Sequence, residues 1–72
     1  MKLTAPQRIY AWELQAGDYL VVKMGSIRKA FHVCEILSND GYNYKVIYND
    51  VRGERVQTEY EANDVVQARF PQ

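Results

Sequence analysis

The chain has 72 residues and a mass of 8.4 kDa, so it can form one small domain, and a chain of this size buries only about 62% of its extended surface on folding. This size argues against a two-domain enzyme, a deep catalytic cleft or a large cofactor pocket. Nine Lys and Arg residues balance nine Asp and Glu residues, so the molecule as a whole lacks the strong field that attracts nucleic acid or an anionic membrane.

Residues 1–13 show no hydrophobic periodicity, and we assign them as an N-terminal extension. A Gly-Asp turn signal then predicts that a strand follows at once. That strand is expected over residues 19–24, which are rich in β-branched and aromatic side chains. We therefore place the domain at residues 14–70 and a short tail at residues 71–72.

A long apolar segment follows a Gly-Ser turn. Residues 28–37 are apolar on both faces, which predicts a strongly bent strand that serves two sheets. Residues 38–41 read Ser-Asn-Asp-Gly, and Asp-Gly is a strong hairpin signal because these residues tolerate positive φ in a tight turn. The return strand is predicted at residues 42–48, where tyrosines recur on one face with a period of two.

Two further strands are predicted near the C-terminus. In residues 54–60, apolar and polar side chains alternate, which is typical of a half-exposed strand. Residues 61–64 are too few for a substantial helix and suit a single 3₁₀ turn. Residues 65–70 form the last strand, which Pro71 ends.

These elements predict an all-β fold, a small five-stranded antiparallel SH3-like barrel with a 3₁₀ turn before the last strand. Closure of the barrel would remove most of the exposed strand edges, which otherwise promote aggregation. An OB-like barrel is the alternative, and it normally needs a longer chain.

Two short motifs support this fold by resemblance. They are Leu14-Gln15-Ala16-Gly17-Asp18 before the first strand and Ala62-Asn63-Asp64-Val65-Val66 at the last strand. Both resemble small SH3-like barrels of the KOW and Tudor types, and the similarity extends over residues 12–70. The resemblance implies a barrel fold and a binding function, as in small proteins of bacteria, phages and mobile elements.

The chain departs from two better-defined members of this group. It lacks the Ala-Leu-Tyr-Asp-Tyr opening and the adjacent Trp pair of signalling SH3 domains, so recognition of PxxP peptides is not expected. A Tudor domain that reads methyl-lysine needs aromatic side chains that converge with an acidic residue. The tyrosines supply the residue types, and ordinary packed sheet tyrosines are the preferred interpretation.

Reactive residues are few. His32 and Cys34 are two apart and lie on one face of a strand, where a thiolate–imidazolium pair is conceivable. A barrel of this size rarely supplies an oxyanion site and a cleft, so we expect no enzymatic activity and read Cys34 as a small core residue. One Cys and one His cannot make a four-ligand zinc site, and no phosphate-binding glycine motif occurs, so no metal or cofactor is predicted.

The late acidic residues and the single cysteine have simple interpretations. Solvated strand edges and turn caps account for Glu54, Glu59, Glu61 and Asp64. A lone Cys34 makes no intramolecular disulfide, and residues 1–6 lack the apolar stretch of a signal peptide, so we expect a cytoplasmic location without membrane association.

The leading functional hypothesis is a non-enzymatic module that binds another protein. Its predicted contact residues combine sheet tyrosines with basic hairpin tips: Tyr42, Tyr44, Tyr48, Arg28, Lys29, Arg52 and Arg55. The alternative is a nucleic-acid (DNA or RNA) binder, in which the basic tips contact phosphates and the tyrosines stack on bases. A homodimer formed through the N-terminal extension is a further expectation.

Overall fold

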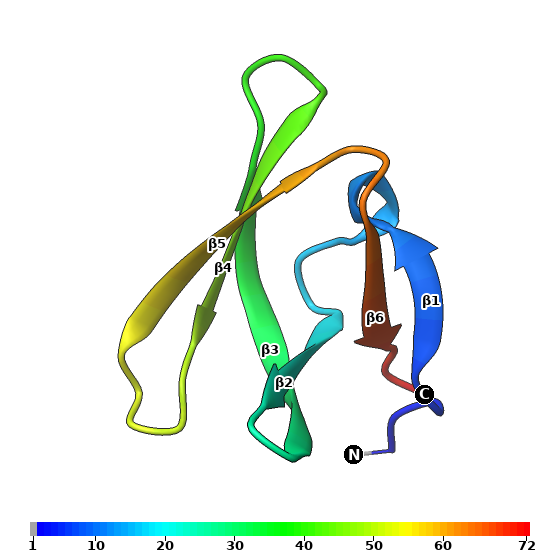
Figure 1. The fold of residues 1–72 in the computed structure, drawn as a ribbon, viewed down its shortest axis with the longest axis vertical. Helices are drawn as coiled ribbons and strands as arrows, with labels where there is room; N and C mark the ends of the chain where they lie inside the picture. The colour runs from blue at the N-terminus through cyan, green and yellow to red at the C-terminus, as the bar shows by residue number, and fades with distance from the viewer. Residues whose placement is uncertain (1) are drawn as a thin grey trace.

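The computed structural model describes residues 2–72, so Met1 of the predicted extension lies outside the described residues. The elements are β1 (Gln7–Tyr10), η1 (a 3₁₀ helix, Ala11–Glu13), β2 (Tyr19–Met24), β3 (Ile27–Leu37), β4 (Asn43–Asn49), β5 (Arg55–Glu61) and β6 (Val65–Arg69). The strands form one sheet in the order β1-β6-β2-β3-β4-β5, in which all neighbours are antiparallel (Figure 1). In the described part of the chain, no helix is long and apolar enough to cross a membrane.

Strand β3 joins the two halves of this sheet. Its first part pairs with β2 as far as His32, and its second part pairs with β4 from Val33 onward. The register shifts between Val33 and Glu35, and such a bulge bends a strand and increases its twist. The structure therefore has the predicted bent strand, which is shared by the two halves of one sheet and does not connect two separate sheets.

The β2–β3 hairpin is closed by Gly25 and Ser26, because Met24 pairs directly with Ile27. Gly25 has a φ of 64°, while Ser26 is not among the residues with positive φ. Positive φ at the first central position only is typical of a type II′ turn, whose twist matches that of the flanking strands. The Gly-Ser signal in the sequence therefore marks the turn correctly.

The predicted closed five-stranded barrel is wrong in two respects. The sheet has six strands, and its edge strands β1 and β5 are not paired with each other. The additional strand, β1, lies within the predicted extension and pairs with β6 from Gln7↔Ala68 to Tyr10↔Val65. Because β1 occupies the second side of β6, β5 cannot close the sheet against it.

The predicted 3₁₀ turn before the last strand is also wrong. Ala62 donates its N–H to the Tyr42 carbonyl at 2.6 Å, so ladder pairing continues past the end of β5. Asp64 then closes a tight turn, because its N–H bonds to the Glu61 carbonyl at 3.0 Å and its carboxylate accepts the Glu61 N–H at 2.8 Å. The 3₁₀ helix is instead η1, whose Ala11 N–H donates to the Asp64 carbonyl at 2.8 Å.

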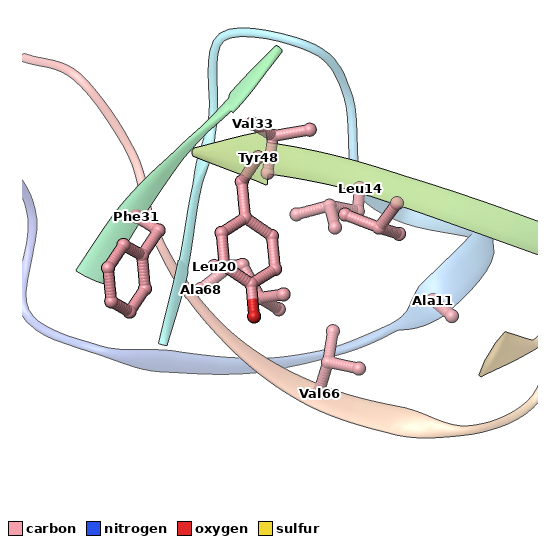
Figure 2. Close-up of a cluster of buried hydrophobic side chains, with 9 residues drawn as sticks. Ala11, Leu14, Leu20, Phe31, Val33, Tyr48, Val66 and Ala68 are labelled. Atoms are coloured by element: carbon pink, nitrogen blue, oxygen red, sulfur yellow. The ribbon is translucent and has the colours of Figure 1, made fainter. Parts of the chain in front are cut away.

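The core lies between the two halves of the curved sheet (Figure 2). Leu20, Val33 and Val46 are its largest fully buried side chains, and burial of such a residue is worth about 1.5–3 kcal/mol. Phe31 and Tyr48 stack with their ring centroids 5.1 Å apart. The core therefore takes residues from η1, Leu14, β2, β3, β4 and β6, and the two edge strands β1 and β5 add half-buried side chains at its border.

Candidate functional site

A pocket of about 650 Å³ lies where the β3–β4 loop meets the end of β5. We call it the acidic groove. Its lining consists of Leu37, Ser38, Asn39, Asp40, Asn43, Tyr44, Lys45, Glu59, Tyr60, Glu61 and Asp64. Four of these residues are acidic and one is basic, and Lys45 is already 4.0 Å from Glu59. The groove therefore has a negative character although the whole chain is neutral.

The β3–β4 loop forms one wall of the acidic groove through Asp40. The Asp40 carboxylate accepts the N–H groups of Tyr42 at 2.9 Å and Asn43 at 2.8 Å, and also the Asn43 side-chain amide at 2.9 Å. These hydrogen bonds to the ionised form, led by the Asn43 N–H, lower the pKa of Asp40 from 3.8 to about 2. Asp40 thus holds the loop in place as a charged group at neutral pH.

Two tyrosines on neighbouring strands form the aromatic part of the lining. Tyr44 on β4 pairs directly with Tyr60 on β5, and both are half-buried. The Tyr44 hydroxyl donates to the Gly41 carbonyl at 3.1 Å, which fixes its ring against the loop. Burial raises the pKa of Tyr60, with smaller contributions from Tyr48 and Asp64. Directly paired side chains have Cβ atoms about 5 Å apart, and both tyrosines line the groove.

Acidic residues of the β5–β6 turn lie on the other side of the groove. The hydrogen bond and the charge of Glu61 raise the pKa of Tyr42, with a smaller contribution from Asp64. Tyr42 is 47% exposed at the base of the β3–β4 loop. Tyr42 therefore lies close to the carboxylates of Glu61 and Asp64, which line the groove.

The structure separates the predicted tyrosine residues from one another. Tyr42 is exposed, Tyr44 lies in the acidic groove, and Tyr48 is only 7% exposed and stacks on Phe31 in the core (Figure 2). The period-two pattern did place Tyr44 and Tyr48 on one face, and that face points inward. Tyr48 is therefore not available to a partner, and its assignment as a contact residue is corrected to a core role.

The predicted basic residues lie elsewhere. Arg28 pairs directly with Lys23 in the β2–β3 hairpin, Lys29 is its exposed neighbour, and Arg52 lies in the β4–β5 loop. These four residues define the basic end. Figure 1 shows both hairpin tips at the end of the long axis opposite the β3–β4 loop. The tyrosines and the basic residues thus do not form the single surface that the sequence suggested.

Arg55, the remaining predicted basic residue, differs from the residues of the basic end because it forms an ion pair. Its guanidinium Nη2 lies 2.9 Å from Oε1 of Glu35, so its charge is already paired.

A second pocket, of about 270 Å³, is lined by Lys23 and Arg28 together with Tyr60 and residues of β6. Of the predicted basic contact residues, Arg55 is thus engaged in an ion pair, whereas Arg28, Lys29 and Arg52 are exposed at the two hairpin tips.

His32 and Cys34 do not form a reactive pair in the structure. Both are exposed, so the interpretation of Cys34 as a small core residue is wrong. The Cys34 Sγ lies 3.8 Å from the His32 carbonyl oxygen and 3.9 Å from the Asn49 side-chain nitrogen. The His32 ring instead packs edge-on against Tyr19, with 5.2 Å between the ring centroids. Within residues 2–72, no group of three His, Cys, Asp or Glu residues could hold a metal ion.

Comparison with protein-family models, curated proteins and solved structures finds no match for the chain. The site therefore rests on its own geometry.

Sequence reasoning missed several residues of the acidic groove. Asp40, Glu61 and Asp64 were read as turn and cap residues, which they are, and Tyr60 was read only as a strand residue. The sequence does contain signals for these residues, namely the Asp40-Gly41 turn and the acidic residues between Glu59 and Asp64. Only the β4–β5 register, which sets Tyr44 opposite Tyr60, brings these two segments together.

Proposed function

We propose that the chain is a non-enzymatic protein-binding module, and that its acidic groove takes a basic segment, rich in lysine or arginine, of a partner protein. One observation carries this proposal: the half-buried side chains of Tyr44 and Tyr60, which are neighbours in the β4–β5 ladder, line one pocket together with Asp40, Glu61 and Asp64. Aromatic faces and carboxylates both attract cations, so the two features favour the same ligand chemistry.

The expected interaction energies are modest. A lysine or arginine over a tyrosine face contributes about 0.5–1 kcal/mol at an exposed site. Ion pairs at an open rim add about 0–1 kcal/mol each and weaken with salt. Several contacts of this kind, rather than one deep anchor, would give reversible binding that suits an adaptor or regulator.

The strand order supports a relationship to SH3-like folds as part of this proposal. Strand β6 lies beside β2, and β2, β3, β4 and β5 follow one another in the sheet. This is the element order on which the sequence resemblance rests, in an open sheet with an added edge strand. Folds of this kind serve many functions, so the proposal depends on the groove and not on the fold.

The experiment is a calorimetric titration with a synthetic peptide of alternating lysine and glycine, compared with a peptide that has glutamate in place of lysine. We expect saturable binding of the lysine peptide only. Tyr44→Ala should weaken it about two- to fivefold, whereas Tyr10→Ala, a matched change at an exposed residue outside the groove, should not. Equal binding by both variants would contradict the proposed site.

A second candidate, nucleic-acid binding, is favoured by the location of the basic end. Lys23, Arg28, Lys29 and Arg52 lie at one end of the molecule, on two hairpin tips that could contact phosphates (Figure 1). Titration with single- and double-stranded oligonucleotides at two salt concentrations tests it. Saturable binding that weakens steeply with salt would support this candidate, and no binding at low salt would remove it.

A further inference from the structure

Strand β5 is an edge strand with little protection. It pairs with β4 in one unbroken register over all of its 7 residues, and no strand lies on its other side. Natural edge strands are usually short, charged, bulged or interrupted by proline, because unpaired backbone groups attract other strands. The other edge strand, β1, follows this rule, since it has 4 residues and begins directly after Pro6. Strand β5 carries the charged residues Arg55, Glu59 and Glu61 but has neither a bulge nor a proline.

Two hydrogen bonds at its ends identify the free backbone groups of β5. The Ala62 N–H bonds to the Tyr42 carbonyl at 2.6 Å, and the Asp50 N–H bonds to the Glu54 carbonyl at 2.9 Å. Bonded and non-bonded pairs alternate in an antiparallel ladder, so pairs with even residue numbers carry the β4–β5 bonds. The N–H and C=O groups of Arg55, Gln57 and Glu59 therefore point away from β4.

In the described chain, no other backbone or side-chain group bonds to these N–H and C=O groups. The backbone groups of Glu61, the next odd-numbered residue, also point away from β4, but they already have partners. Its N–H already donates to the Asp64 carboxylate at 2.8 Å, and its carbonyl accepts the Asp64 N–H at 3.0 Å. The available edge is thus limited to Arg55, Gln57 and Glu59.

We propose that β5 pairs with β5 of a second copy of this chain, antiparallel and centred on Gln57, to form a two-fold symmetric dimer. In this register Gln57 faces Gln57, and Arg55 of each copy faces Glu59 of the other. Every free N–H and C=O group of Arg55, Gln57 and Glu59 then gains a partner. Val56 lies opposite Thr58, so small β-branched side chains meet on the inner face.

The charge pattern of β5 favours a second copy over an unrelated strand. Arg55 lies two positions before Gln57 and Glu59 two positions after it, so the reversed edge is complementary to itself in charge. In the dimer, each charge would be shared between the second copy and its present partner, Glu35 for Arg55 and Lys45 for Glu59. A symmetric contact of this type closes after two copies and does not continue into a fibre. A register centred on Thr58 would instead need the Glu61 groups that the β5–β6 turn already uses.

This dimer does not depend on the proposed function, because Tyr44 and the β3–β4 loop take no part in it and Gln57, at its centre, does not line the acidic groove, although Glu59 does. The experiment is sedimentation equilibrium of the full chain over a wide range of concentrations. We expect a reversible monomer–dimer equilibrium. Gln57→Pro should abolish the dimer, because the proline blocks the centre of the new ladder and removes an N–H that points away from β4. Gln57→Val, which keeps the N–H, should dimerise like the wild type.

A charge exchange provides a second test that does not depend on proline. Glu59→Arg places like charges opposite each other and should weaken dimerisation roughly tenfold. The double variant Arg55→Glu/Glu59→Arg restores opposite charges across the two-fold axis and should recover most of the affinity. A wild-type chain that stays monomeric at all concentrations, or a double variant no better than Glu59→Arg, would overturn the proposal.

Discussion

Arg55 on β5 reaches across β4 to Glu35 on β3, with 2.9 Å between its Nη2 and the Glu35 Oε1. The register places Ile47 between Glu35 and Gln57 on the outer face of the sheet. Ile47 is only 2% exposed although its neighbours along β4, Val46 and Tyr48, point to the core. Ile47 is thus a buried isoleucine outside the core cluster, on the face of the sheet that carries the Arg55–Glu35 ion pair.

Ile47→Ala should therefore destabilise the protein far more than removal of the ion pair above it. Loss of a buried isoleucine costs about 2–5 kcal/mol, whereas Glu35→Gln should cost no more than about 1 kcal/mol, because the Arg55 and Glu35 side chains are 64% and 48% exposed. Urea unfolding measures both free energies. A free energy of unfolding unchanged by Ile47→Ala would contradict the burial of this side chain.

Tyr48→Ala should lower the free energy of unfolding by about 3–5 kcal/mol, because the ring fills the core against Phe31. Tyr48→Phe keeps the ring and should change it by no more than about 1 kcal/mol. Tyr42→Ala, at an exposed residue of the same predicted surface, should stay within about 0.5 kcal/mol of the wild type. Similar losses for Tyr42→Ala and Tyr48→Ala in thermal or urea unfolding would argue against the core role of Tyr48.

The strands and turns were largely readable from the sequence, because their signals are local. Residues 19–24 coincide with β2, and Gly25 marks its turn. Strand β1 was missed because Gln7–Tyr10 has little periodicity of its own and is defined by pairing with β6. Because β1 pairs with the free side of β6, β5 cannot pair there and the sheet stays open. A local sequence pattern cannot indicate such a long-range pairing.

The candidate site was less predictable for the same reason. Period two put Tyr44 and Tyr48 on one face but could not say that this face is the inner one, or that a partner ring from Tyr60 lies beside Tyr44. Pairing of Arg55 with Glu35, 20 positions away in sequence, also depends on the sheet and not on spacing. The sequence showed which charged and aromatic residues the chain contains, but not which of them lie next to one another in the folded sheet.

Gly25→Ala should destabilise the protein by about 1 kcal/mol, because a φ of 64° is disfavoured for any residue with a Cβ. No atom lies within 4 Å of a Cβ at this position, so the cost is that of the backbone conformation alone. Ser26→Ala, at the neighbouring position without positive φ, is the matched control and should be nearly neutral. Equal unfolding free energies for the two variants would contradict the assigned turn.

Acid should loosen the β3–β4 loop at a defined pH. The Asp40 pKa is lowered to about 2 in the folded protein from its usual 3.8, so its ionised form stabilises the fold above about pH 4. This contribution is lost as the pH falls from about 4 through 2. Titration of the Asp40 carboxyl carbon by NMR should show a midpoint near 2. A midpoint near 3.8 would mean that the hydrogen bonds from Tyr42 and Asn43 do not form.

The central claim is that the acidic groove binds a basic protein segment, and amide chemical-shift mapping tests it most directly. The ¹⁵N-labelled chain is titrated with the lysine-glycine peptide. We predict saturable shifts at Asp40, Tyr44 and Asp64, which line the groove. Shifts confined to Arg28 and Arg52 at the opposite end of the molecule, or no saturable shift at any residue, would contradict the claim.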